Sequence, residues 1–149
     1  MNQVGVMLRG QGRLGEAEVL YRRALEGKER VLGADHPDTL GSVNNLGSLL
    51  QDQGKLEEAE VLYRRALEGY ERVLGADHPN TLLFMYNFAD FLQKKGDLSS
   101  AESLALRSLQ GYALRNMKTD VKDGVEQLTG ILRAQNKTEE ANAVAEQYS

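Results

Sequence analysis

The sequence has no cysteine, no tryptophan and only two prolines. Without cysteine the chain can form no disulfide, no cysteine-ligated zinc site and no iron–sulfur cluster, and it has no thiol nucleophile. The net charge is -4, and the sequence has no cluster of lysines and arginines of the kind that binds nucleic acid or an anionic membrane surface. The longest apolar run, Leu82–Met85, is far too short to span a membrane. We therefore expect a soluble, intracellular protein, most simply cytoplasmic, with no nucleic-acid partner and no direct membrane insertion.

What the sequence does have is a long internal repeat. The segment Glu16–Leu40 recurs as Glu58–Leu82 with two differences, which sets a period of 42 residues. A weaker third copy follows at the same spacing and a degenerate fourth copy at 40. Repeats of this length are supersecondary units that bury their core against neighbouring units. We therefore predict a single array with units at about 1–34, where the first helix is truncated, then 35–76, 77–117 and 118–149, the last being a capping unit.

Each full unit has the pattern of two helices. In the second unit, apolar residues recur every three or four positions over 59–74, which predicts a long amphipathic helix. A helix from about Pro37 to Gln51 precedes it, with proline in the first turn, where its missing N–H is harmless. Gly54 separates the two helices and Gly75 ends the second. No segment has the pattern of a strand, so the fold is expected to be all-α, built of antiparallel helical hairpins.

The exposed side of the long helix carries acid–base pairs four residues apart. Glu60 precedes Arg64, and Glu68 precedes Arg72. Such pairs stabilise a helix by a few tenths of a kcal/mol each. We interpret them as a solvated helix face and not as a functional site.

Small and large residues recur in a fixed register within the hairpins. Gly47 and Ala59 fall where the tetratricopeptide repeat pattern W-x-x-L-G-x-x-Y…A-x-x-x-F places its small residues. The 42-residue period and the segments LYRRALEGYERVLGADHP and VNNLG resemble the kinesin light chain type of tetratricopeptide repeat. The resemblance implies a right-handed superhelical solenoid of antiparallel helical hairpins. It also implies a concave groove, lined by the first helix of each hairpin, that binds peptides.

The candidate binding surface is the polar side of these first helices. In the second and third units it consists of Asn44, Asn45, Ser48, Gln51, Asp52, Tyr86, Asn87, Asp90, Gln93 and Lys94. The fourth unit has Glu126, Gln127, Gly130, Arg133 and Ala134 at these positions. Asparagine amides can donate to and accept from a peptide backbone, and a tyrosine adds a flat apolar platform with a polar tip. The alternative is that the strip is ordinary solvated helix surface.

The charge of this strip bears on the kind of partner. The grooves of kinesin light chains resemble basic receptors for acidic peptides, whereas here Asp52 and Asp90 outnumber Lys94. Acidic cargo is therefore disfavoured. The sequence also lacks a heptad segment of the kind that joins a kinesin light chain to its motor, so we do not expect a motor subunit.

A second comparison concerns the tetratricopeptide clamp that binds chaperones. That clamp uses lysines and arginines at positions held here by Asn2, Asn44 and Tyr86. Capture of a C-terminal carboxylate is therefore disfavoured as well.

Three motifs suggest chemistry that their context does not support. Gly10–Gly15 matches G-x-G-x-x-G, but a dinucleotide site needs a preceding strand, so we interpret the segment as a turn between helices. His36 and His78 stand one repeat apart in Asp-His-Pro segments, which indicates helix starts and not a shared metal site. Asn136–Thr138 fits the glycosylation pattern but lacks a secretory signal, so we expect a turn between the last two helices. We expect no catalytic site, no metal and no cofactor.

The two ends of the array differ in pattern. The last unit is polar and carries Ala145 where the first two units have a tyrosine, as expected of a capping unit. The first unit lacks the Asp-His-Pro start. We therefore expect either a fragment of a longer array or a second protein that covers the stripe of Val4, Leu8, Ala17 and Tyr21, and we expect the isolated chain to fray there or to self-associate.

The sequence thus predicts a non-catalytic protein–protein interaction scaffold that binds a peptide or partner segment in its concave groove. The alternative is a structural or assembly subunit of a larger complex, held through its edges and its uncapped N-terminal end.

Overall fold

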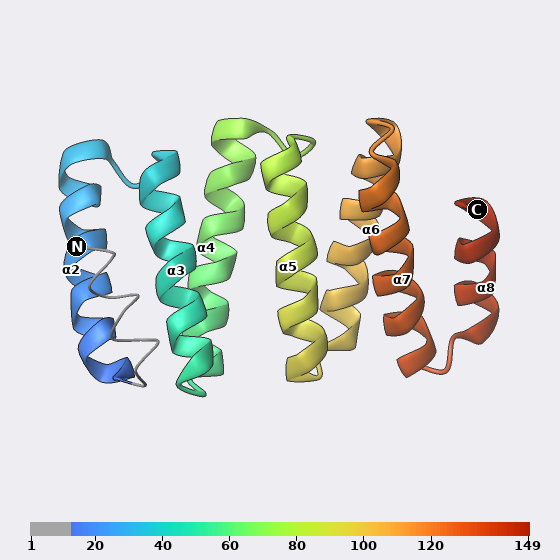
Figure 1. Cartoon of the computed structure of the whole chain (residues 1–149), viewed down its shortest axis with the longest axis horizontal. Helices are drawn as coiled ribbons and strands as arrows, with labels where there is room; N and C mark the ends of the chain where they lie inside the picture. Colours follow the sequence, from blue (N-terminus) through green and yellow to red (C-terminus); the bar gives the residue numbers. More distant parts are fainter. Residues whose placement is uncertain (1–12) are drawn as a thin grey trace. The chain divides into compact units, whose positions relative to one another are not determined.

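The computed structural model describes residues 13–149, and these form seven α-helices and no strand. The helices are α2 (Leu14–Leu32), α3 (Pro37–Asp52), α4 (Leu56–Leu74), α5 (Pro79–Lys95), α6 (Leu98–Leu114), α7 (Lys118–Ala134) and α8 (Thr138–Gln147). The chain divides into two compact units, Met1–Gly75 and Ala76–Ser149. Figure 1 shows α2 to α4 in the first unit and α5 to α8 in the second, with short loops between consecutive helices.

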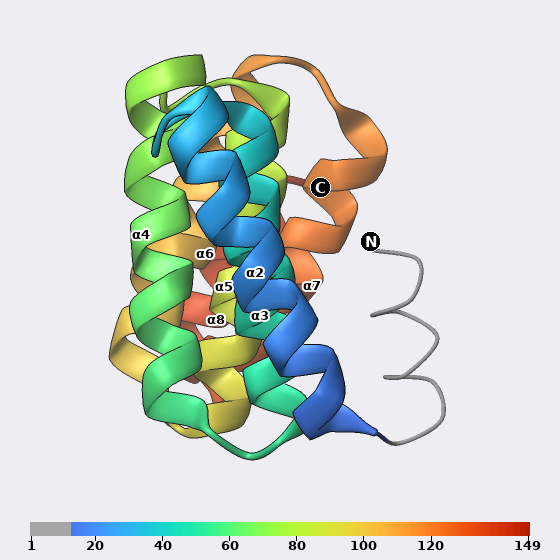
Figure 2. The ribbon, with the colours of Figure 1, turned by 90° about the vertical axis from the view of Figure 1, so that its left-hand side faces the viewer.

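In unit 1, α3 lies between two longer helices and packs against both α2 and α4. Figure 2 shows α2 in front of α3, with α4 beside them. The apolar side chains of α3 supply most of this core, since Leu40, Val43, Leu46, Leu49 and Leu50 are at most 1% exposed. The predicted antiparallel hairpin is therefore present in this unit.

In unit 2, each helix packs against the next, and α7 also contacts α5. The core is more aromatic than that of unit 1. The rings of Phe84, Phe88 and Phe91 form two tilted pairs whose centroids are 6.2 Å apart. Such pairs add to the apolar burial that holds helices together.

Glycines allow the close approach of paired helices. A Cβ built on Gly47 would lie 2.8 Å from Cε1 of Tyr63, so the predicted small position is confirmed. Gly69 on α4 lies against the methyl groups of Leu40 in the same way, and Gly111 on α6 lies against those of Leu82.

Four turns between helices are closed by the same backbone hydrogen bond. A residue with positive φ follows the helix: Gly54 (79°), Gly96 (100°), Asn116 (55°) and Asn136 (63°). The next residue donates its N–H to a carbonyl five positions back, in the pairs Lys55–Leu50, Asp97–Leu92, Met117–Tyr112 and Lys137–Leu132. This is the Schellman arrangement, which glycine and asparagine favour. The predicted turns at Gly54 and at Asn136–Thr138 are confirmed.

The Asp-His-Pro segments start helices, as predicted. Nδ1 of His36 accepts the N–H of Asp38 at 3.1 Å, and Nδ1 of His78 accepts that of Asn80 at 3.0 Å. Each histidine is thus the N-cap, and the following proline occupies the first turn. The imidazole takes the place that serine or aspartate commonly fills.

The shorter spacing before the last unit has a local cause. Helix α4 has 19 residues and is followed by a four-residue loop, whereas α6 has 17 and is followed by the three residues 115–117. In this second loop Nε of Arg115 donates to the carbonyl of Asp77, which ties the end of α6 to the segment before α5.

Two predicted features at the start of the chain are only partly testable. Val4, Leu8 and Gly10–Gly12 lie outside the described residues. Ala17 and Tyr21, the other members of the predicted stripe, are 0% and 6% exposed, so these two side chains are not available at the surface.

In residues 13–149, no helix combines the length and the apolar character needed to cross a membrane.

Candidate functional site

The predicted strip on α3 is the accessible side of a helix whose other sides are buried. Asn45 and Asp52 are exposed, and Asn44, Ser48 and Gln51 are half-buried. The side-chain oxygen Oε1 of Gln51 accepts the Tyr63 hydroxyl at 2.9 Å. Gln51 therefore joins α3 to α4, and this oxygen is already engaged in the fold.

The strip on α5 in unit 2 has the same arrangement. Asn87 and Lys94 are exposed, whereas Tyr86, Asp90 and Gln93 are half-buried. Nζ of Lys94 lies 2.9 Å from a carboxylate oxygen of Asp90, one helical turn away, and both side chains are about half exposed or more. Exposed pairs of this kind contribute only about 0.3–0.5 kcal/mol.

Helix α7 packs against α5 in unit 2. Nε2 of Gln127 donates to the carbonyl of Tyr86 at 2.8 Å, and a Cβ on Gly130 would lie 4.0 Å from Nε2 of Gln93. Gln127 was expected at the groove surface, but it is only 9% exposed, so that expectation is wrong. Its amide links the two helices because its side chain points from α7 to the backbone of α5.

Burial raises the pKa of the Tyr86 hydroxyl, and the charges of Asp123, Asp90 and Glu126 raise it further. The sequence comparison identified Asp90 and Glu126 by their positions, but it missed Asp123, which lies one turn before Gln127 on the same side of α7.

A second tyrosine experiences the same negative field. Burial raises the pKa of Tyr112 to about 12, with further contributions from Asp120, Tyr86 and Asp123.

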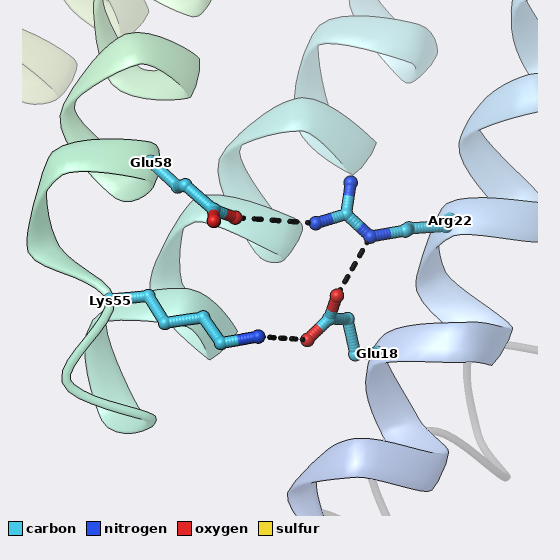
Figure 3. A network of polar contacts seen from close by, with 4 residues as sticks. All are labelled: Glu18, Arg22, Lys55 and Glu58. Atoms are coloured by element: carbon cyan, nitrogen blue, oxygen red, sulfur yellow. Dashed lines mark hydrogen bonds and ion pairs between the residues drawn. The ribbon is translucent and has the colours of Figure 1, made fainter.

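A charged network in unit 1 has a structural role. Figure 3 shows Glu18 of α2 between Arg22 and Lys55, at 2.8 and 3.2 Å, with Glu58 3.5 Å from Arg22. These contacts link α2 to the start of α4. The hydrogen bond from Arg22, helped by Lys55, holds the pKa of Glu18 below its usual value despite partial burial.

Two further ion pairs extend this link along the same helices. Arg65 pairs with Glu29 at 2.8 Å, and Arg72 binds Asp35 through two nitrogens. The predicted pair Glu60–Arg64 is present at 2.9 Å, whereas Arg72 reaches back to Asp35 and not to Glu68 as expected.

Within 13–149, no group of three histidine, cysteine or acidic side chains is placed to hold a metal ion. An open cavity of about 660 Å³ lies beside α7. Its lining combines apolar side chains such as Val121, Val125 and Tyr148 with the charged side chains of Lys118, Lys122 and Glu126. The sequence did not predict this cavity.

These observations define a protein built of tandem helical hairpins with polar strips on the first helix of each hairpin. Comparison with known families gives the tetratricopeptide repeat, which matches residues 1–38 and 39–80. The chain belongs to the tetratricopeptide repeat family. Proteins of this family are in general protein–protein interaction scaffolds and generally not catalysts.

Solved structures show the same fold. A putative kinesin light chain from Podosopora anserina with nearly identical TPR-like repeats is similar at a TM-score of 0.84 and 21% identity, over 99% of this chain and 71% of that one. BtubC (BKLC) from P. vanneervenii is similar at a TM-score of 0.82 and 20% sequence identity, over 97% of this chain. The present chain spans 59% of the length of BtubC. No curated protein matches the sequence. The predicted all-α tetratricopeptide fold, of the kinesin light chain-like kind, is confirmed.

Proposed function

We propose that this protein is an interaction scaffold that holds a peptide or partner segment on the polar strips of α3 and α5. The observation that carries the proposal is the matched exposure of Asn45 and Asn87. These residues stand one repeat apart, and both are exposed on helices that are otherwise largely buried. Amides on such a surface can pair with the N–H and C=O groups of an extended backbone.

Asn45 and Asn87 are exposed, so they can be altered without changing the apolar cores, which makes the proposal testable. The double variant Asn45→Ala/Asn87→Ala removes two amides without touching the apolar cores, so we expect an unchanged unfolding midpoint. Partners captured from native extract by the immobilised wild-type protein should be reduced several-fold with this variant. The matched control is Glu68→Ala/Gln110→Ala, which alters two exposed positions on α4 and α6. An identical set of captured proteins for both variants would contradict strip binding.

A second candidate function is favoured by exposed apolar side chains on the outer helices. Val19 on α2 and Val61 on α4 stand one repeat apart and are 51% and 66% exposed. A subunit of a larger assembly would bury such positions in an interface. Under this alternative, Val19→Ser/Val61→Ser would release the protein from a large complex in size-exclusion chromatography of native extract, whereas the asparagine variant would not.

A further inference from the structure

We propose that the cavity beside α7 is a binding site for a small amphipathic anion, a carboxylic acid with an apolar body. The volume of the cavity is about 660 Å³, and ligand sites in proteins commonly have about 300–1,000 Å³. The cavity belongs to unit 2 alone, where α7 packs against both α6 and α8 (Figure 1). None of the strip residues on α3 and α5 lines it, so it is a second site on the scaffold.

One side of α7 supplies one wall of the cavity. The charged and apolar side chains of this wall belong to Lys118, Val121, Lys122, Val125 and Glu126. Spacings of three and four residues place side chains on the same face of a helix. The other lining residues come from the ends of α6 and α8 and from the positions just after these helices: Ala113, Asn116, Ala145, Tyr148 and Ser149.

The apolar part of the lining is accessible to a ligand. Val121 and Val125 on α7 are half-buried, as are Ala113, Ala145 and Tyr148. Each of these side chains therefore keeps apolar surface that a bound apolar group would remove from water, which favours binding. An alkyl chain or an aromatic ring is the body that this lining accommodates.

Two lysines select the charge of the ligand. Lys118 and Lys122 are exposed, and both line the cavity one turn apart on α7. In the part of the chain that the structure describes, neither lysine takes part in an ion pair. Lys118 is also the first residue of α7, where the helix dipole adds positive potential. A carboxylate at this end of the cavity is attracted by both ammonium groups and by the helix N-terminus.

The acidic side chains of α7 leave this end of the cavity positive. Asp120 and Asp123 do not line the cavity, and both help to raise the pKa of Tyr112 on α6. Glu126 does line the cavity, but it lies eight residues beyond Lys118, which is about 12 Å along the helix axis. An acid that binds with its carboxylate beside the two lysines therefore keeps its charge away from Glu126.

Titration of the ¹⁵N-labelled chain with soluble amphiphiles tests the proposal. The probes are sodium decanoate, decyltrimethylammonium bromide and sodium acetate, each below the concentration at which micelles form. We expect decanoate to shift the amide signals of Val121, Lys122 and Val125 to saturation and to leave those of Asn45 and Asn87 unchanged. Acetate lacks the apolar body and decyltrimethylammonium has the opposite charge, so each should bind about ten-fold more weakly.

A charge-matched pair of variants tests the role of the lysines. Lys118→Gln/Lys122→Gln should weaken decanoate binding about five-fold, because the carboxylate loses both ammonium groups. The control is Arg23→Gln/Arg30→Gln, which makes the same change in net charge on exposed side chains of α2 and should leave the affinity within about two-fold.

A second variant tests the apolar wall. Val121→Thr/Val125→Thr keeps the approximate shape of the lining and adds two hydroxyl groups, so it should weaken decanoate binding several-fold. Unchanged circular dichroism spectra and unfolding midpoints verify that each variant is folded.

Three results would overturn the proposal. The first is a set of decanoate shifts spread over both units, which indicates non-specific adsorption. The second is equal binding of decanoate and decyltrimethylammonium at the cavity. The third is that a synthetic peptide of repeated Glu-Leu-Ala shifts the cavity signals while decanoate does not, which would assign the cavity to a partner segment. The strips on α3 and α5 are tested separately by the asparagine variant, so failure here leaves the proposed function standing.

Discussion

Gly69 of α4 lies directly against the side chain of Leu40, with no space for a Cβ between them. Gly111 has the same relationship to Leu82 one repeat later, whereas Gly27, at the equivalent place on α2, has no described atom within 4 Å of its would-be Cβ. Three glycines at one repeat position thus have two different environments.

Substitution by alanine should separate these environments. Gly69→Ala and Gly111→Ala should each lower the free energy of unfolding by about 1–2 kcal/mol, since overpacking outweighs the gain in helix propensity. Gly27→Ala should raise it by about 0.5–1 kcal/mol, because only the propensity term remains. Urea denaturation measures all three. Equal effects at the three positions would contradict the packing described for α4 and α6.

The histidine caps should each contribute measurably to stability. His36→Ala and His78→Ala should each cost about 1 kcal/mol, because the N–H of Asp38 or Asn80 loses its acceptor. Replacement by aspartate, a stronger N-cap, should restore or exceed wild-type stability. Thermal unfolding gives the comparison. Alanine variants as stable as the aspartate variants would show that the imidazole acceptor is dispensable.

The pKa of Glu18 predicts acid sensitivity of unit 1. Because Arg22 and Lys55 lower the pKa of this carboxyl in the folded chain, its stabilising contribution is complete above the ordinary glutamate value of 4.5. That contribution is lost as the pH falls from this value through the lower folded value. Glu18→Gln should therefore destabilise the chain at pH 7 but hardly at pH 2–3. Glu26→Gln on the same helix is the control, and an equal pH dependence for both variants would argue against the network of Figure 3.

Asn136 should be replaceable by glycine and not by alanine. Its φ of 63° is unfavourable for residues with a Cβ, although asparagine tolerates it better than most. We expect Asn136→Ala to lower stability by about 1 kcal/mol and Asn136→Gly to leave it nearly unchanged or to raise it. Differential scanning calorimetry of the two variants, with Asn142→Ala on the exposed side of α8 as reference, tests this.

The repeat made the helices and turns predictable, because each depends on signals within a few residues. The periodic apolar positions, the prolines after His36 and His78, and Gly54 define local structure in any context. No local signal shows which helices pack together. That pairing was predicted from the resemblance to tetratricopeptide repeats.

Features that depend on contacts between helices were predicted less well. Arg72 has an acidic neighbour four residues away, yet it binds Asp35, 37 residues back, because helix packing brings the loop before α3 within reach. Gln127 has the composition of a surface residue, but the approach of α7 to α5 buries it.

The near-identity of α2 and α4 does not make their contacts with α3 equivalent. Both helices pack against α3, and over the repeated segment their sequences differ at one position, which is Lys28 in α2 and Tyr70 in α4. Gly69 of α4 lies against Leu40 of α3, whereas the equivalent Gly27 of α2 has no described atom within 4 Å of its would-be Cβ. The two helices therefore present different sides to α3, so a single repeated sequence serves two different helix contacts in unit 1.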